Sequence, residues 1–142
     1  MYLPEIIREA IVARLNAVST AHSAIYRSPV PVYTAYPAYV LEYASVDNLW
    51  DSTATDKKVM MFNLYVIYTY DNTEASRELA EKAISDAVGE LYRVVFEKPD
   101  VLALPNGWLR LSNVSWGYGG TEDVPQRMAQ VQIAVTVHQD RL

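Results

Sequence analysis

The chain has 142 residues, a formal net charge of −5 and no cysteine. This length suits one domain that buries its own core without a metal or a disulfide, and the lack of cysteine excludes disulfide frameworks, thiolate zinc sites and cysteine nucleophiles. The net charge has the wrong sign for a protein that neutralises nucleic-acid phosphates.

The first elements predicted along the chain are a helix, an extended crossing and a strand. Pro4 suits a first helical turn, and apolar residues at helical spacing predict a helix from Leu3 to about Ala21. The prolines within Arg27–Pro37 disfavour both a helix and a central strand, so this segment should be extended and polyproline-like. Alternating side chains then predict a strand over Ala38–Val46.

The middle of the chain contains the longest predicted strand. A polar loop over Asp47–Lys57 precedes it, and the strand itself covers Lys58–Tyr70. At about 3.3 Å per residue this strand would span about 40 Å, which is longer than most strands. We therefore expect it to extend past the body of the domain or to bend at a bulge.

A second helix is predicted to follow and to end near Val95. Asp71, with Glu74 three residues later, has the form of a capping box in which Asp71 is the N-cap. The expected buried stripe of this helix is Ala75, Leu79, Ala83, Val88 and Leu91, together with Ile84 and Ala87. The expected solvent face is Glu74, Glu78, Glu81, Lys82, Asp86 and Glu90.

The last two predicted strands are joined by a glycine-rich connection, Gly117–Pro125. The strand Trp108–Trp116 should place Leu109, Leu111 and Asn113 on one face and Trp108, Ser112, Val114 and Trp116 on the other. In Arg127–His138, clean alternation directs Ala129, Val131, Ile133, Val135 and Val137 toward the core. The elements predict a single α+β domain over residues 1–142, in the order αββαββ: a mostly antiparallel sheet of about four strands with two helices packed on one face.

The sequence lacks motifs for catalysis, cofactors and metals. The run Gly117–Glu122 begins like a dinucleotide-binding fingerprint but ends in glutamate where that motif has its last glycine. Neither His22 nor His138 has a second histidine or a carboxylate at ligand-like spacing. We therefore predict no enzyme activity, no cofactor and no metal. The longest apolar stretch, Val59–Tyr70, is also too short to cross a membrane, so a soluble protein is expected.

The composition indicates more apolar surface than one copy hides, because the chain has 11 tyrosines and three tryptophans. Both faces of Lys58–Tyr70 are apolar or aromatic, whereas a two-layer domain needs only one such face. Because most soluble oligomers are homo-oligomers, we expect another copy of the chain to cover the second face. The alternative is that a loop or the proline-rich segment covers it within one chain. The candidate interface residues are Trp50, Asp51, Met61, Tyr65, Ile67, Trp116 and Tyr118.

Four segments in chain order carry a resemblance to a known family. They are the helical pattern Ile7-x-x-x-Ile11-x-x-x-Leu15, the long strand Met60–Tyr68, the helical pattern Ala75-x-x-x-Leu79-x-x-x-Ala83 and the last strand Arg127–Val135. In these segments, in size and in element order, the chain resembles the tail terminator (tail-completion) proteins of long-tailed bacteriophages.

The resemblance implies a hexameric ring on the last ring of the tail tube, which stops tube polymerisation and offers a surface to the head-connector proteins. It implies a virion protein made in the host cytoplasm, without catalysis or cofactor, through whose channel DNA passes without specific binding. Three contact regions are implied. Asp47–Lys57 with the start of the long strand would reach a ring neighbour or the tube, Gly117–Gln126 would contact an axial partner, and the second face of Lys58–Tyr70 would lie in the subunit interface.

Other functions stay open from the sequence. A head-completion adaptor, or another tail or neck subunit, would use similar surfaces. A small α+β regulatory domain would bind a metabolite in a pocket with convergent polar groups, for which Asn63, Asn113 and Ser115 are the candidates. A hydrolase without a recognisable motif is the third alternative.

Overall fold

The computed structural model describes residues 3–21, 24–29, 36–50, 55–71, 73–104, 107–122 and 124–140. The elements, in chain order, are α1 (Leu3–Val18), β1 (Ala24–Tyr26), β2 (Ala38–Trp50), β3 (Thr55–Thr69), α2 (Glu74–Glu90), the π-helical turn η1 (Leu91–Val95), β4 (Gly107–Gly120) and β5 (Pro125–Asp140). The predicted α+β class is confirmed, whereas the predicted number and order of the strands need correction.

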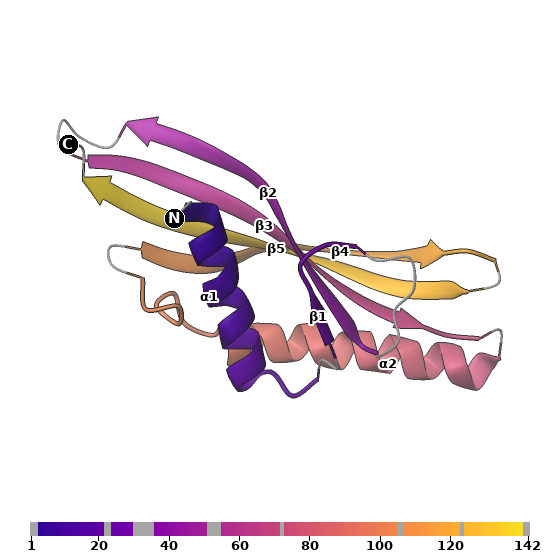
Figure 1. Ribbon diagram of the computed structural model, residues 1–142. Helices are drawn as coiled ribbons and strands as arrows, with labels where there is room; N and C mark the ends of the chain where they lie inside the picture. The colour runs from indigo at the N-terminus through magenta and orange to yellow at the C-terminus, as the bar shows by residue number, and fades with distance from the viewer. Residues whose placement is uncertain are drawn as a thin grey trace.

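The strands form one five-stranded sheet in the order β1-β2-β3-β5-β4 (Figure 1). The four long strands pair antiparallel, and β1 pairs parallel with β2 through Ala24–Tyr26. The predicted order αββαββ missed β1, because three residues are too few to show a period-two pattern. Most of the predicted polyproline-like crossing, residues 30–35, lies outside the described residues.

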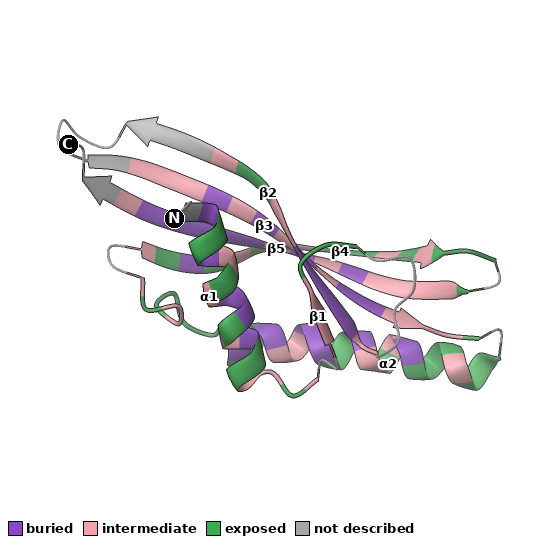
Figure 2. Cartoon of the chain, viewed as in Figure 1, coloured by how far each residue is buried: buried purple, intermediate pink, exposed green. Residues whose placement is uncertain are grey.

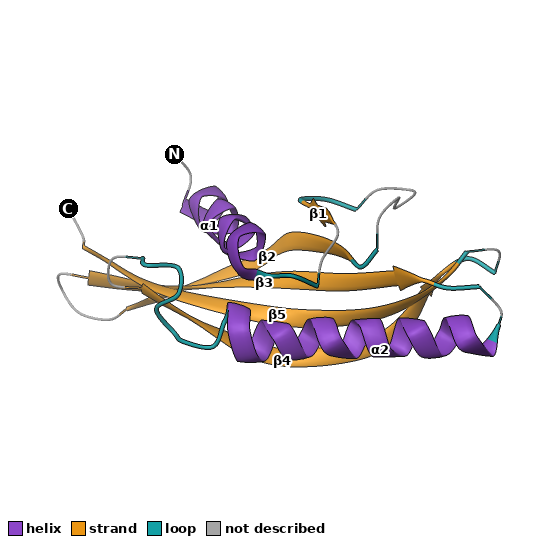
Figure 3. Cartoon of the chain, turned by 90° about the horizontal axis from the view of Figure 1, so that it is seen from below, coloured by secondary structure: helices purple, strands orange, loops and turns teal. Residues whose placement is uncertain are grey.

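The central hairpin is longer than predicted. Residues expected in the loop Asp47–Lys57 continue the ladder instead, with Asp47 opposite Val59 and Trp50 opposite Asp56. Polar residues tolerate a strand here because pairing with β3 satisfies their backbone groups. As expected for so long a strand, the β2–β3 hairpin extends past the helices (Figures 1 and 3). The register shift in this pair lies in β2, between Tyr43 and Ser45.

The two helices cover one side of the sheet, which we call the inner face. Ile7, Ile11 and Leu15 of α1, spaced by four, are fully buried in the same cluster as Ile84 of α2 and Phe62 of β3. On β5 the predicted inward residues are all buried, as the alternation indicated: Ala129, Val131, Ile133, Val135 and Val137. Figure 2 shows the buried positions gathered along the sheet and on the helix sides that face it. Neither described helix is long and apolar enough to span a membrane.

The start of α2 differs from the predicted capping box. The N-cap is Thr73, whose Oγ1 accepts a 3.2 Å hydrogen bond from the Ser76 amide. Asp71 lies outside the helix, and its Oδ1 accepts bonds from the Thr73 amide at 2.9 Å and the Thr73 hydroxyl at 2.7 Å. The carboxylate therefore positions the capping residue rather than serving as the cap.

The buried stripe of α2 is also rotated from the predicted one. Leu79 is 56% exposed and Ala75 is exposed, whereas Ile84 is completely buried. The stripe consists of Ala80, Ile84, Ala87 and Val88, continued by Leu91 and Val95 of η1. The apolar residues of α2 fit two alternative buried stripes at helical spacing. Packing against β3 and β5 selects the stripe that leaves Leu79 exposed.

The helices are joined at their ends by two charged side chains. Glu90, predicted on the solvent face, accepts hydrogen bonds from the Ser19 hydroxyl at 2.7 Å and the Thr20 amide at 3.0 Å, just beyond α1. In return, Nε of Arg14 in α1 donates to the Val95 carbonyl at 2.9 Å, at the end of η1. A helix end leaves backbone groups without partners inside the helix. Each of these two charged side chains pairs with backbone or hydroxyl groups at the end of the neighbouring helix.

A bulge in β4 reverses the faces predicted for its second half. Pairing with β5 shifts register between Leu111 and Asn113. Leu111 is opposite Ile133, and Val114 is opposite Val131, so both lie on the inner face. The sequence prediction had separated them, because it assumed unbroken alternation.

Candidate functional site

The side of the sheet opposite the helices, which we call the outer face, contains most of the surface predicted for a partner. On β3 this face consists of Val59, Met61, Asn63, Tyr65 and Ile67, which alternate with the buried inner residues. Met61 and Tyr65 are half-buried, whereas Ile67 is 4% exposed. The surplus apolar face therefore exists, but it is not uniformly open.

Part of the outer face is covered by the chain itself. Ala38, Val40 and Ile67 form a second small buried cluster. Tyr26, which precedes the proline-rich segment Arg27–Pro37, and Tyr36, near the end of that segment, pack against this cluster together with Tyr65 and Met128. Intramolecular cover, the alternative considered from the sequence, thus applies to the Ile67 end of β3. Toward Met61 the described residues leave the face half-exposed.

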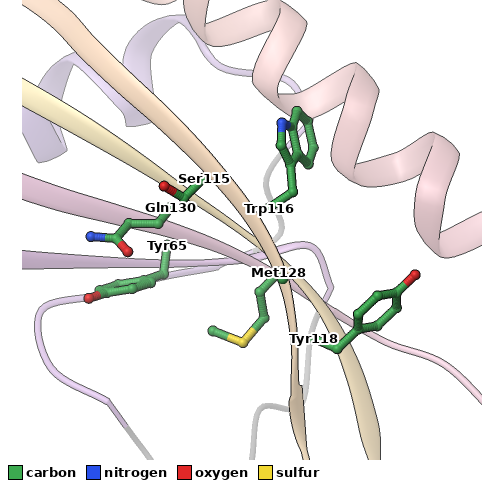
Figure 4. Close-up of a pocket in the computed structure, with 7 residues that line it drawn as sticks. Tyr65, Ser115, Trp116, Tyr118, Met128 and Gln130 are labelled. Atoms are coloured by element: carbon green, nitrogen blue, oxygen red, sulfur yellow. The ribbon is translucent and has the colours of Figure 1, made fainter.

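Two adjoining hollows lie across this face and share Tyr65 and Met128. One, of about 190 Å³, reaches β4 and is lined by Tyr65, Ser115, Trp116, Gly117, Tyr118, Met128 and Gln130. The other, of about 200 Å³, reaches β2 and is lined by Pro29, Val40, Glu42, Tyr65, Ile67 and Met128. Figure 4 shows Tyr65, Met128 and Gln130 on one side of the strands, while the Trp116 ring lies on the side of α2.

Tyr65 is the polar centre of the outer face. Burial raises the pKa of its phenol, and the nearby Glu42 carboxylate raises this pKa further, while a hydrogen bond with Asn63 opposes both effects. The phenol thus stays protonated at neutral pH and keeps a donor at the surface. Such a group fits a polar contact inside an apolar interface better than it fits a general base.

The candidate aromatic residues of β4 lie on the inner face, beyond the cover of α2. Trp116 is 48% exposed and Tyr118 is 70% exposed. Between them and α2 lies Arg127, whose Cζ is 4.5 Å from the Tyr118 ring centroid and 5.8 Å from that of Trp116. Arg127 Nε is 2.7 Å from Oε1 of Glu81, and Nη1 donates to the Gly117 carbonyl at 2.9 Å. Glu81, predicted as part of a solvated helix face, instead forms a cross-element ion pair.

The seven predicted interface residues are therefore not one constellation. Met61, Tyr65 and Ile67 lie on the outer face, while Trp116 and Tyr118 lie on the inner face. Trp50 ends β2 opposite Asp56, but its side chain lies outside the described residues, and so does Asp51. Sequence reasoning missed Met128 and Gln130 as lining residues and Arg127 as an ion-pair partner. The outward alternation of Met128 and Gln130 was visible, but the strand and the helix beside these three residues were not.

Among the described residues, those proposed from the sequence for metal or metabolite binding lie apart in the structure. The described part of the chain contains no group of three or more His, Cys, Asp or Glu side chains placed to hold a metal ion. His138 lies on the outer face, as predicted, with its ring 5.1 Å from that of Trp108. His22 lies outside the described residues. Of the proposed metabolite-binding residues, Ser115 lines a hollow, Asn63 contacts Tyr65, and Asn113 is exposed.

No protein-family model matches the chain, and no curated protein is similar to it in sequence.

Proposed function

We propose that this protein is a structural subunit that acts by assembling with copies of itself, as a ring that caps a bacteriophage tail tube, ends its polymerisation and joins it to the head connector. The observation that supports this proposal best is the outer face of the sheet. Met61 and Tyr65 leave apolar surface half-exposed there, beside two shallow hollows. Contiguous apolar surface on a small domain usually marks a partner.

The shape of the sheet supports an axial role. The β2–β3 hairpin lies at one end of the long strands, and the turn between Gly120 and Pro125 lies at the other. A subunit that links a tube to a connector needs contact regions at two opposite ends. These two hairpin ends coincide with regions for which the resemblance implies contacts, Asp47–Lys57 and Gly117–Gln126.

A small-molecule function is less well supported by the geometry. Each hollow is about 200 Å³ or less, whereas ligand pockets usually enclose roughly 300–1,000 Å³ and bury most of the ligand. Both hollows are open along the sheet surface and present few convergent polar groups. A head-completion adaptor or another neck subunit would use the same surfaces, and the position of the ring in purified particles separates these roles.

The test is assembly of the purified chain, measured by native mass spectrometry and negative-stain imaging, alone and with isolated tail-tube ends. We expect a ring of about six subunits, or capping of tube ends. Tyr65→Arg places a charge at the centre of the outer face and should abolish assembly. Leu79→Arg places the same charge at an exposed apolar position on α2 and should leave assembly unchanged. A chain that stays monomeric at about 100 μM and ignores tube ends would overturn the proposal.

A further inference from the structure

The two long edges of the sheet are open for most of their length. Among the described strands, β4 has a neighbour on one side only, which is β5. The amides of Gly107 and Leu109 at its other edge are already bonded to the Leu104 and Pro99 carbonyls, at 3.3 and 2.8 Å, so this edge is open from Arg110 onward. At the other edge, β1 covers only Ala38–Val40 of β2, so Leu41–Trp50 faces no described strand. Open edges present unpaired backbone groups, which are templates for pairing with another chain.

The strand directions make these two edges complementary to each other. β2 and β5 run one way, and β3 and β4 run the other way. If a second copy is placed beside the first in the same orientation, its β2 lies antiparallel to β4. Pairing of β4 with the β2 of the next copy is head-to-tail, and such an interface generates a ring when its rotation closes.

The irregularities of the two edges also match. β4 shifts register between Leu111 and Asn113, and β2 shifts register between Tyr43 and Ser45. A bulge normally discourages pairing with a regular strand. When Arg110–Trp116 lies antiparallel to Leu41–Asp47, however, the two stretches are equal in length and their bulges fall side by side.

The charges of the two edges are opposite. In the sequence of β4 the one charged residue is Arg110, whereas Leu41–Trp50 contains Glu42 and Asp47 and no basic residue. The register with matched bulges sets Arg110 opposite the position of Asp47 and Ser115 opposite that of Glu42. Opposite charges directly across two strands stabilise the pairing, and like charges weaken it.

We infer that copies of this chain join through their sheets, with Arg110–Trp116 of β4 in one copy adding antiparallel to Leu41–Asp47 of β2 in the next. The pairing stops at Trp116, because the partner's β1 occupies the position beyond Leu41. The inference rests on the proposed assembly and adds to it an edge contact between neighbouring copies, beside the outer-face contact at Tyr65.

Disulfide trapping tests this joint without background, because the chain has no cysteine. Two single variants, Ser115→Cys and Glu42→Cys, are mixed under assembly conditions and oxidised. We expect a mixed dimer of the two variants and no dimer from either variant alone. Ser115→Cys mixed with Ser45→Cys is the off-register control and should cross-link at least about fivefold less, since Ser45 lies three residues along β2 from the position opposite Ser115.

Charge exchange provides a second test, which does not need the two side chains to be placed as accurately as a disulfide does. Arg110→Glu should weaken association about tenfold per interface, and Arg110→Glu combined with Asp47→Lys should restore it to within about twofold. Circular dichroism confirms that both variants fold.

The outcomes separate this inference from the proposed function. Assembly without the 115–42 cross-link, or with a 115–115 cross-link, would overturn the edge joint and leave the assembly role standing. Assembly that Arg110→Glu leaves unaffected would also overturn the joint. Failure of the unmodified chain to assemble, with or without tube ends, would overturn both.

Discussion

The contact between Glu90 and the end of α1 yields the sharpest stability prediction. The carboxylate accepts hydrogen bonds from the Ser19 hydroxyl at 2.7 Å, the Thr20 amide at 3.0 Å and the Ala21 amide at 3.2 Å, and also from the Thr20 hydroxyl. The substitution Glu90→Gln keeps the shape and one acceptor oxygen. It removes the charge and turns an NH2 group toward groups that are themselves donors.

The expected cost follows from the number and kind of these bonds. A hydrogen bond to a charged group contributes about 1.5–3 kcal/mol, and a neutral one about 1 kcal/mol. Glutamine retains part of the set, and the partly exposed loop can rebind water. We therefore expect Glu90→Gln to lower the free energy of unfolding by about 2 kcal/mol, which corresponds to a fall in Tm of about 6 °C for a domain of this size.

Urea denaturation at pH 7, followed by far-UV circular dichroism, measures this loss. Glu78→Gln is the matched control, because Glu78 lies on the exposed side of the same helix, and it should change stability by less than about 0.5 kcal/mol. Equal stability losses in the two variants would refute the structural role assigned to Glu90.

The same contact predicts a pH dependence with a defined sign. Burial raises the pKa of Glu90, but hydrogen bonds from Thr20, Ser19 and the backbone outweigh burial, and the net pKa lies below its usual value. A depressed carboxylate pKa gives stabilisation that is present above the unfolded pKa of about 4.3 and is lost as pH falls through the folded pKa. The stability difference between wild type and Glu90→Gln should therefore shrink below about pH 4. Tyr39 stays neutral throughout, because burial raises its pKa to about 12.

Two further predictions test α2. Ile84→Ala should lower the free energy of unfolding by about 2–4 kcal/mol because Ile84 is completely buried, whereas Leu79→Ala should lower it by less than about 0.5 kcal/mol. Denaturation midpoints measure both losses, and equal losses would contradict the orientation of the helix. Thr73→Ala should lower the free energy of unfolding by about 1 kcal/mol through loss of the N-cap bond from Ser76, and Asp71→Ala should lower it less because Asp71 acts through Thr73. A larger effect of Asp71→Ala in thermal melts would favour the predicted capping box, with Asp71 as the N-cap.

Elements with unbroken periodicity were predictable from the sequence. In β5 the alternation continues from Ala129 to Val137 without a bulge, and every inward residue is buried as expected. In α1 the spacing of Ile7, Ile11 and Leu15 allows one buried stripe, and it is the observed one. Local pattern and tertiary packing agree in these elements, so the sequence alone suffices.

The sequence failed where partners rather than patterns decide. Thr55–Lys57 is polar and typical of a loop, yet pairing with β2 and β5 makes it strand. Glu90 looks like a solvated helix residue, and only the position of the α1 terminus gives it partners. In α2 two helical spacings competed, and contact with the sheet decided between them.

The bulge in β4 had the largest consequence for the candidate site. One extra residue between Leu111 and Asn113 moves Trp116 and Tyr118 to the inner face, beside Arg127, and leaves Ser115 and Gly117 on the outer face. A partner lying flat on the outer face would therefore miss both exposed aromatic rings. Residues of both faces alternate along the free edge of β4. The exposed aromatic rings and the outer-face residues Ser115 and Gly117 therefore come closest to each other at this edge. A chain added at this edge as far as Trp116 would contact that inner aromatic residue with one side and the hollow at Ser115 with the other.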